Sequence, residues 1–362
     1  MKPTEQPASD RLLELKIGIF RALKLGDMLS VIPAVRAIRH AFPIAHITLI
    51  GLPWEEKLVS RFSHYFNGFV SFPGWPGLPE QEIAPVRMTD FLRQMQHLQL
   101  DLLLQMQGDG SYTNAMCLLC GAKQVAGLRL KRHAVPGGGL FPVFRENEHE
   151  VLRFLRLVKE ALGIDPAGTA LEFPVMREEY EEAGCIMEVL GLTPGKYICL
   201  HPGARDPRRR WEPAKFAVAG DRLARAGFHI LLTGDRSERD ITRQVASLMH
   251  YPAADLVAGC GQVDLGVLAA LIEQGAGLLC NDTGVSHLAA ALEVPSVVVF
   301  SPYSSAARWA PLDHTLHMAV APEAAADPEK VACRLLRCLS RLPATASVSG
   351  RVSPDPVTGL NP

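Results

Sequence analysis

The sequence lacks a large net charge of either sign, long apolar runs and an apolar stretch near its start. Lys and Arg number 37 and Asp and Glu 38, so the formal net charge is −1 and no global positive field holds a nucleic-acid backbone. No apolar run approaches the roughly 20 residues that span a bilayer. The opening text, MKPTEQPASDRLLELK, has no apolar h-region. We therefore expect a soluble, cytoplasmic protein without a secretory signal or a nucleic-acid partner.

Cysteine is scattered, and no second Cys/His pair stands at zinc-ligand spacing from the one C-x-x-C, Cys117 and Cys120. That motif suits either redox chemistry or half of a zinc site. The surrounding text, AMCLLCGAK, is typical of an apolar helix, and buried free cysteine behaves as a small hydrophobe. We expect both thiols to have packing roles, and we expect no metal site and no cofactor.

What remains is a globular composition with an alternating pattern. Hydrophobic residues make up 48% and charged residues 21% of 362 residues, which suits two domains of roughly 150 to 180 residues each. Short β-rich runs alternate with helical stretches, which predicts α/β folding with a parallel sheet in each half. Candidate strands are 16–21, 46–51, 100–105, 197–201, 229–234, 277–281 and 296–300. Candidate helices are 31–40, 177–190, 213–226, 238–249, 285–292 and 328–339.

The boundary between the halves falls near residues 172–195, where a charged helix separates EFPV from GLTPG. We expect an N-terminal domain over 1–175 and a C-terminal domain over 176–326. A last helix, over 327–342, is expected to pack back across both domains. Residues 343–362 are rich in Pro, Ser, Thr, Val and Gly without a period, which predicts a disordered tail.

Two further patterns have more than one interpretation. The basic stretch RLKRH (129–133) suits a solvated face or a mobile loop that contacts an anionic acceptor. An apolar stripe at helical spacing favours core packing over membrane contact. Its members are Leu58, Phe62, Tyr65, Phe66 and Phe69.

Three segments stand where an open α/β sheet binds ligands, just beyond the carboxyl ends of strands. The first is Leu25-Gly26-Asp27, which follows the strand at 16–21. Gly26 permits a tight turn, and Pro33 favours a helix that begins near Ser30. Asp27 is then either a helix N-cap or a cleft carboxylate poised as general base toward an acceptor hydroxyl.

The second segment is CNDTGVSH (280–287), where a strand ends and Asp282-Thr283-Gly284 turns into a helix. The first amides of such a helix point outward unpaired and favour a phosphate. Thr283 adds a hydroxyl donor. His287 lies four residues later, one turn deeper on the same helix face, and is expected to line a polar cleft.

The third segment runs from HPGAR (201–205) to the arginines and Trp of 208–211, after the strand at 197–201. The arginine run is either a solvated charge cluster or a site that neutralises a diphosphate with bidentate contacts. Nearby, TGDRSE (233–238) ends a strand of the same sheet, and a carboxylate there is placed to bond ribose hydroxyls.

Together these segments resemble glycosyltransferase family nine, the heptosyltransferases that act on lipopolysaccharide. The specific part is D-T-G-x-S-H before an apolar strand, paired with an N-terminal L-G-D. Weaker similarity elsewhere extends the resemblance to most of residues 16 to 340. The matching text is FRALKLGDMLSVIPAVRAIRHAFPIAHITLIG (20–51), HPGARDPRRRWEPAKFAVAG (201–220), LLTGDRSERD (231–240) and LIEQGAGLLCNDTGVSHLAAALEVPSVVVFSP (271–302).

The resemblance implies a GT-B fold, in which two Rossmann-like domains with parallel sheets face a central cleft. The N-terminal domain would take the acceptor and the C-terminal domain the nucleotide-sugar donor. The implied reaction is an inverting, metal-independent transfer of heptose from ADP-L-glycero-D-manno-heptose to a hydroxyl of a lipopolysaccharide-type glycan. A lipid-linked acceptor would imply transient contact with the inner face of the membrane.

The resemblance also implies roles for individual residues. Asp27 would be the catalytic base. Thr283 and Gly284 would hold the diphosphate, while Asp282 and His287 would line the donor site. Glu238 falls where the family places a carboxylate on the adenosine ribose.

Two departures from the family pattern bear on the donor. The family usually has a Lys just before the Trp of the third segment, where this chain has three arginines. We assign Arg209 and Arg210 to the donor site, although arginine changes the geometry and the register of the run stays open. The turn before Gly26 usually carries small hydroxyl residues and here reads Ala22-Leu23-Lys24. Donor or acceptor identity can differ accordingly.

The chemistry has the same requirements without the family. An inverting transfer needs one base for the acceptor proton and a positive environment for the departing diphosphate. Asp27 on one domain and the arginine run with Thr283 on the other would supply these roles. Two alternatives stay open: another GT-B enzyme that uses a UDP- or GDP-sugar, and a non-catalytic nucleotide-sugar binding protein.

Overall fold

The computed structural model describes residues 14–135, 137 and 139–341, and the chain divides into two compact units. Among the described residues, the N-terminal unit comprises 14–23, 34–145 and 154–167. The C-terminal unit comprises 24–33, 146–153 and 168–341. Two short stretches of the first half, Lys24–Pro33 and Glu146–Arg153, therefore pack with the C-terminal unit. The predicted domains, 1–175 and 176–326, placed both stretches in the N-terminal domain.

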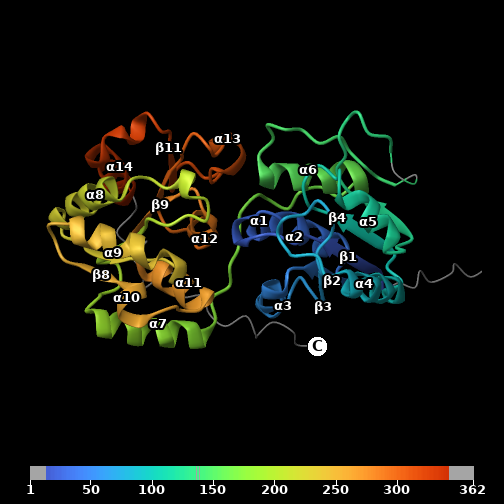
Figure 1. The fold of residues 1–362 in the computed structure, drawn as a ribbon, viewed down its shortest axis with the longest axis horizontal. Helices are drawn as coiled ribbons and strands as arrows, with labels where there is room; N and C mark the ends of the chain where they lie inside the picture. The colour runs from blue at the N-terminus through green and yellow to red at the C-terminus, as the bar shows by residue number, and fades with distance from the viewer. Residues whose placement is uncertain (1–13, 136, 138, 342–362) are drawn as a thin grey trace, which may run out of the picture. The chain divides into compact units, whose positions relative to one another are not determined.

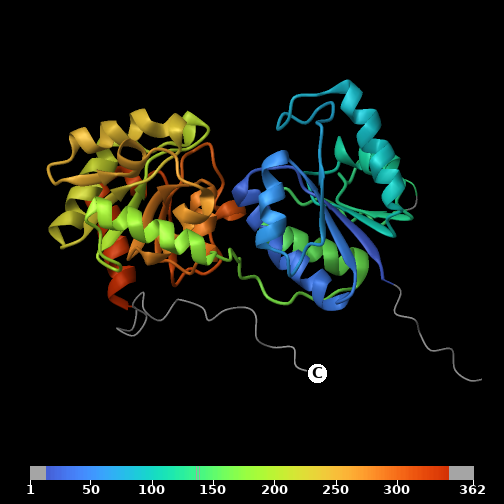
Figure 2. The ribbon, with the colours of Figure 1, turned by 90° about the horizontal axis from the view of Figure 1, so that it is seen from below.

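The N-terminal unit is built on a five-stranded parallel sheet with the order β3-β2-β1-β4-β5. Its core packs aromatic and aliphatic side chains such as Phe20, Phe72 and Phe91. Figure 2 shows helices on both sides of this sheet. The strands are β1 (Lys16–Phe20), β2 (His46–Gly51), β3 (Gly68–Ser71), β4 (Leu102–Gln105) and β5 (Gln124–Ala126). The helices are α2 (Ile32–Ala41), which begins in the C-terminal unit, α3 (Glu56–Arg61), α4 (Pro85–Leu98), α5 (Thr113–Leu119) and α6 (Glu150–Leu162), whose first turn also belongs to the C-terminal unit.

The C-terminal unit is built on a six-stranded parallel sheet with the order β11-β10-β9-β6-β7-β8. The strands are β6 (Tyr197–His201), β7 (His229–Leu232), β8 (Ala253–Asp255), β9 (Gly277–Asn281), β10 (Ser296–Val299) and β11 (His317–Val320). The helices are α1 (Leu25–Leu29), α7 (Arg177–Leu190), α8 (Pro213–Arg225), α9 (Arg239–Leu248), α10 (Leu256–Cys260), α11 (Leu265–Gln274), α12 (Gly284–Ala291), α13 (Ala306–Trp309) and α14 (Pro328–Arg341).

Both sheets follow the order of a doubly wound nucleotide-binding fold. Read from β8, the C-terminal sheet runs third, second, first, fourth, fifth, sixth in chain order, so the connections reverse direction between β6 and β9. Helix α8 contacts α9 and α14, whereas α11 contacts α7 and α12, so helices form layers on the two faces of the sheet (Figure 1). Ligands of such sheets bind at the reversal, beyond the carboxyl ends of the strands.

All seven predicted strands are present, and the predicted helices are found to within a few residues. The strands that the sequence did not predict are β3, β5, β8 and β11. Each is three or four residues long and lies at or next to a sheet edge. A strand such as β8, with the sequence AAD, carries almost no apolar alternation that could reveal it.

Several smaller predictions concern side chains away from any cavity. Cys117 and Cys120 are buried in the N-terminal core, and burial raises the pKa of both thiols, so their packing role is confirmed. Four members of the apolar stripe, Leu58, Phe62, Tyr65 and Phe66, are buried in the core, and Phe69 is half-buried. The helical spacing was wrong, because α3 ends at Arg61 and Phe69 lies in β3.

Helix α14 packs on α8 and on the last strands of the C-terminal sheet. Its predicted packing across both domains stays a prediction, and the predicted tail at 343–362 lies outside the described residues. In the part of the chain that the structure describes, every helix is too short or too polar to cross a bilayer.

Candidate donor-binding site

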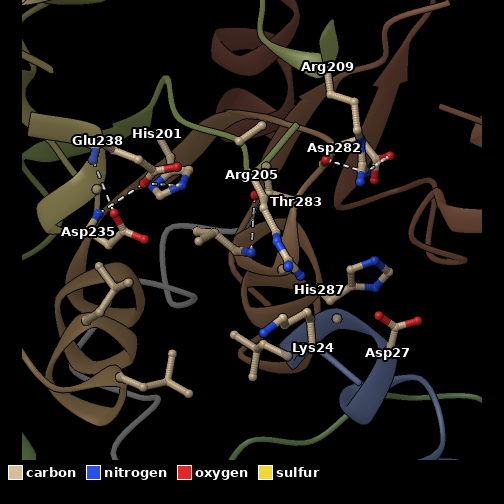
Figure 3. Close-up of a pocket in the computed structure, with 18 of the residues that line it drawn as sticks. Lys24, Asp27, His201, Arg205, Arg209, Asp235, Glu238, Asp282, Thr283 and His287 are labelled. Carbon is tan, nitrogen blue, oxygen red and sulfur yellow. Dashed lines mark hydrogen bonds and ion pairs between the residues drawn. The ribbon is translucent and has the colours of Figure 1, made fainter. Parts of the chain in front are cut away.

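A cavity of about 490 Å³ lies in the C-terminal unit at the carboxyl ends of β6, β7 and β9 (Figure 3). Its volume suits a small ligand. It occupies the place where the strand order reverses, which is where the sheet geometry predicts a ligand. The lining residues are Lys24–Asp27, His201, Ala204, Arg205, Arg209, Gly234, Asp235, Glu238, Gln262, Val263, Leu265, Leu268, Asp282–Val285, His287 and Trp309.

The start of α12 forms one wall of this pocket. Thr283 is the N-cap of the helix, and its hydroxyl oxygen accepts a hydrogen bond from the amide of Val285 at 3.3 Å. Thr283 and Gly284 both line the cavity, so the start of α12 borders it. The Thr283 hydroxyl caps the Val285 amide, and the Ser286 amide donates to the Thr283 carbonyl oxygen. Binding of an anion by this turn stays a prediction.

Asn281 joins this wall to the loop that follows β6. Its side-chain oxygen accepts a hydrogen bond from the amide of Trp211 at 2.8 Å. Its side-chain nitrogen donates to the carbonyl oxygens of Pro202 and Gly203 at 2.9 and 3.1 Å. Asn281 is fully buried. One amide thus holds both ends of the loop that carries the arginines.

The three arginines of that loop have different partners. Arg208 bonds the carboxylate of Asp206 through Nε and Nη2. Arg209 forms an ion pair with the buried carboxylate of Asp282 and also donates to the Asp282 carbonyl oxygen. Burial raises the pKa of Asp282, and the Arg209 guanidinium acts against that rise.

Arg210 donates through Nε to the carbonyl oxygen of Ala204 at 2.8 Å and is not among the lining residues. Arg209 therefore lines the pocket, whereas the Arg210 side chain bonds the backbone of its own loop. A direct contact between Arg210 and the donor stays a prediction.

Glu238 lies on the opposite side of the cavity, next to β7. Its carboxylate accepts a hydrogen bond from the amide of Asp235 at 3.0 Å, while Asp235 in turn caps the short helix that begins at Arg236. A Cβ atom at position 203 would lie 2.0 Å from Glu238 Oε1, so only glycine there lets this carboxylate approach the β6 loop.

His201 connects Glu238 to the sheet. Its Nδ1 lies 3.1 Å from the Thr233 hydroxyl and its Nε2 lies 3.6 Å from Glu238 Oε2. Burial lowers the pKa of His201, and the carboxylates of Glu238 and Asp235 act against that shift. The carboxylate of Glu238 is therefore held by the Asp235 amide, lies beside His201 and Gly203, and lines the cavity.

Helix α1 carries Asp27 into the same pocket. Asp27 is the third residue of α1, whose N-cap is Lys24, so of its two interpretations the helix N-cap is wrong. A separate helix, α2, begins at Ile32 with Pro33 in its first turn. The chain thus makes two helical segments where one was expected, and α1 packs on α12 within the C-terminal unit. Figure 3 shows the side chains of Asp27 and His287 facing the same part of the pocket.

His287 lies in α12 and is buried. Burial lowers its pKa to about 4, with smaller contributions from His149 and Arg209, so its ring is neutral at physiological pH. The ring of Trp309 packs edge-on against it, with centroids 5.8 Å apart. Behind that contact, Arg308 bonds Glu150 at 2.9 Å, and His149 bonds the carbonyl oxygen of Ala310 at 2.8 Å.

The structure therefore brings together all the predicted site residues except Arg210: Asp27, Arg209, Glu238, Asp282, Thr283, Gly284 and His287. It adds Lys24, Arg205 and Trp309, which sequence reasoning did not assign to the site. Lys24 and Arg205 are exposed charged residues beside the motifs, and Trp309 lies in a stretch that carried no recognised motif. Among the residues that the structure describes, no cluster of three or more His, Cys, Asp or Glu side chains is placed to hold a metal ion.

Comparison with known proteins agrees with the sequence resemblance. Residues 88–338 match the sequence model of glycosyltransferase family 9 (heptosyltransferase). The chain is 27% identical over 157 residues to lipooligosaccharide heptosyltransferase 2 of Haemophilus ducreyi, covering 41% of this chain and 45% of that protein. It is 22% identical to lipopolysaccharide heptosyltransferase 1 of Pseudomonas aeruginosa over 80% of this chain and 79% of that protein.

Among solved structures, the fold matches that of the Escherichia coli ADP-heptose lipopolysaccharide heptosyltransferase II with a TM-score of 0.72. The identity is 19%, over 90% of this chain and 99% of that one. The α/β class and the GT-B fold with two Rossmann-like domains are thereby confirmed. The alignment with the Haemophilus relative spans less than half of that protein's length.

Proposed function

We propose a function from the premise that this chain belongs to glycosyltransferase family 9 (heptosyltransferase). It transfers a heptose from ADP-heptose to a hydroxyl of a lipopolysaccharide-type glycan. The observation that carries the proposal is the composition of the pocket in the C-terminal unit. A helix N-terminus with a hydroxyl cap, a fixed carboxylate and a second carboxylate on α1 all line it. These are the groups that a nucleotide-sugar donor and an attacking hydroxyl require.

The donor is proposed to lie with its diphosphate at the start of α12. Thr283 and Gly284 would bond the phosphate oxygens through amides and a hydroxyl. Glu238 would accept hydrogen bonds from the ribose hydroxyls, and its attachment to Asp235 and His201 fixes the distance at which it does so. Asp282 and His287 would border the heptose. The similar E. coli protein is an ADP-heptose heptosyltransferase, which supports the same donor here.

Asp27 is proposed as the general base. The acceptor hydroxyl attacks the anomeric carbon from the face opposite the diphosphate, and its proton passes to the Asp27 carboxylate. The attack inverts the anomeric configuration, so the product should carry the configuration opposite to that of the donor. NMR of the product tests this point directly.

The charge of the departing diphosphate is proposed to be taken up by the first amides of α12 and by side-chain cations, without a metal ion. Turnover in excess EDTA that equals turnover without it would support this part of the proposal. A glycan or lipid-linked acceptor is proposed as partner, with a cytoplasmic location and transient contact with the inner face of the membrane when the acceptor carries lipid.

Thermal unfolding with ADP, UDP and GDP is the first test. A ligand at about 100 times its Kd adds roughly 2.7 kcal/mol, which corresponds to a shift of several degrees in Tm. We expect ADP to shift the Tm and UDP and GDP not to do so. A Tm shift with UDP or GDP alone would mean that the donor is a UDP- or GDP-sugar rather than ADP-heptose. ADP binding with neither transfer nor hydrolysis of ADP-heptose would favour the non-catalytic alternative.

A further inference from the structure

The arginine run after β6 is expected from the sequence to neutralise the diphosphate, but its guanidinium groups have protein partners. Arg208 is paired with Asp206 and Arg210 with the Ala204 carbonyl oxygen. Arg209 reaches the pocket, yet its charge is matched by Asp282, whose side chain is only 2% exposed. Arg208 and Arg209 are thus paired with carboxylates, while Arg210 keeps its charge but does not line the cavity.

Two other cations line the cavity, Lys24 and Arg205. Both are exposed, and within the described residues neither side chain makes an ion pair or a hydrogen bond with another protein group. Figure 3 shows both side chains directed into the pocket. They come from different elements, since Arg205 follows β6 and Lys24 precedes α1.

The position of Lys24 relative to α12 is set by close packing of backbone on backbone. A Cβ atom at Gly26 would lie 3.4 Å from Gly284 Cα, and one at Gly284 would lie 3.2 Å from Leu25 Cβ. Helix α1 therefore packs tightly against the first residue of α12, with little room for a side chain at either glycine. Lys24, one residue before α1, is held beside the turn that would carry the phosphates.

We propose that Lys24 and Arg205 are the two cations that bind the donor diphosphate, from either side of the start of α12. The inference rests on the proposed function, because it names the residues that recognise the diphosphate of that donor. Arg205 would contact two phosphate oxygens in a bidentate manner, and Lys24 would act as a compact point charge.

These cations matter most as the bond to the sugar breaks. The bond between the anomeric carbon and the terminal phosphate oxygen cleaves, and its electron pair stays on that oxygen. The acceptor oxygen forms the new bond to the anomeric carbon, and the acceptor proton passes to Asp27. ADP thus gains one negative charge, which Lys24 and Arg205 stabilise.

The test is titration calorimetry of the full chain with ADP, AMP and adenosine. The variants are Lys24→Gln, Arg205→Gln and the double variant. Each single change should weaken ADP binding about tenfold or more, because it removes a charged hydrogen-bond donor. Adenosine binding should stay within about twofold, since adenosine has no phosphate. Rising salt should weaken ADP binding less in the double variant than in the unmodified chain.

Arg243→Gln is the matched control. Arg243 is exposed on α9 and lies outside the pocket lining, so its loss removes the same charge without touching the ligand. We expect this variant to bind ADP as the unmodified chain does. Equal Tm values for all variants would show that they fold, as expected for exposed side chains.

The outcomes separate the inference from the proposed function. If the unmodified chain binds ADP and the Lys24 and Arg205 variants bind it equally well, the inference is overturned while the donor stands. If UDP or GDP binds instead and both variants lose it, the donor is wrong and the inference stands. If the unmodified chain binds neither a nucleoside diphosphate nor inorganic diphosphate, both are overturned.

Discussion

Gly26 lies so close to His287 that a Cβ atom at position 26 would sit 2.7 Å from the ring carbon Cδ2. The contact joins the residue before the proposed base to the buried ring in α12. Because the ring is packed against Trp309, it has little room to move away. The placement of Asp27 in the pocket therefore depends on the absence of a side chain at its neighbour.

Replacement of Gly26 by Ala should push α1 away from α12. We expect a loss of roughly 1–3 kcal/mol in the free energy of unfolding from overpacking. We also expect a fall in kcat of about 100-fold, because displacement of a reacting group by about 1 Å has that effect. Urea unfolding and a transfer assay measure the two effects.

Gly184→Ala serves as the control for that change. Gly184 lies in α7, where an added Cβ would meet nothing within 4 Å, so alanine should stabilise by about 0.5–1 kcal/mol. If Gly26→Ala behaved like Gly184→Ala in both assays, the close approach of α1 and α12 would have no functional consequence.

Replacement of Asp27 by Asn should lower turnover by about 10²- to 10⁴-fold, because the amide cannot accept the acceptor proton. The Kd for ADP should change little, since the proposed donor contacts come from other residues. Steady-state transfer kinetics and calorimetry with ADP measure the two quantities. Asp90→Asn, an exposed change on α4, is the control. Turnover near that of the unmodified chain would remove Asp27 as the base.

Replacement of Asn281 by Ala should both destabilise the C-terminal unit and weaken ADP binding. The change leaves the Trp211 amide and the Pro202 and Gly203 carbonyls without their partner. Buried groups that lose a hydrogen bond cost about 1–3 kcal/mol each, so we expect a total loss of at least about 3 kcal/mol for the three groups. The loop that carries Arg205 would loosen, and the Kd for ADP should rise.

Gln96→Ala provides the comparison for Asn281. The exposed Gln96 amide makes a hydrogen bond to the Leu119 carbonyl at 3.0 Å in the N-terminal unit. Its loss should cost about 1 kcal/mol or less and should not change ADP binding. Equal unfolding curves for the two variants would contradict the role given to Asn281.

Stability should fall as the pH drops below neutral, because buried histidines stay neutral in the folded chain. Burial lowers the pKa of both His287 and His317 to about 4. In the unfolded chain a histidine binds its proton near pH 6.5, so between about pH 6.5 and 4 the unfolded state binds more protons. Each histidine then lowers the free energy of unfolding by up to about 3 kcal/mol across that window.

His317→Gln isolates this effect from the ligand site. His317 bonds Ser296 at 2.9 Å between β10 and β11 and does not line the pocket. Urea unfolding at several pH values should show a flatter pH dependence in this variant, with ADP binding at pH 7.5 unchanged. His97→Gln, at an exposed position on α4, should keep the original slope. An unchanged slope in His317→Gln would count against a neutral buried His317.

Local pattern was enough to predict where the pocket lies. The strand endings at His201 and Asn281 are visible as apolar runs that stop at polar residues, and D-T-G marks the turn into α12. Parallel strands place such turns along one sheet edge, so their proximity followed from topology alone. Thr283, Gly284 and His287 line the pocket for that reason.

The sequence pattern did not predict which side chains form ion pairs with one another. The arginine run reads as one block of charge, but Arg209 pairs with Asp282, 73 positions along the chain. Likewise, the sequence pattern predicted only a tight turn at Gly26, where the structure has helix α1. The packing of α1 on α12, in the other half of the chain, was not predicted.

The amino-acid sequence by itself determined the α/β alternation, the two sheets and the sheet edge at which the pocket lies, because these depend on short-range periodicity. The tertiary structure alone decided which cations line that pocket without a carboxylate partner and where Asp27 lies. Those outcomes depend on contacts between residues far apart in the chain, where a buried carboxylate takes up one arginine and two glycines let two helices meet.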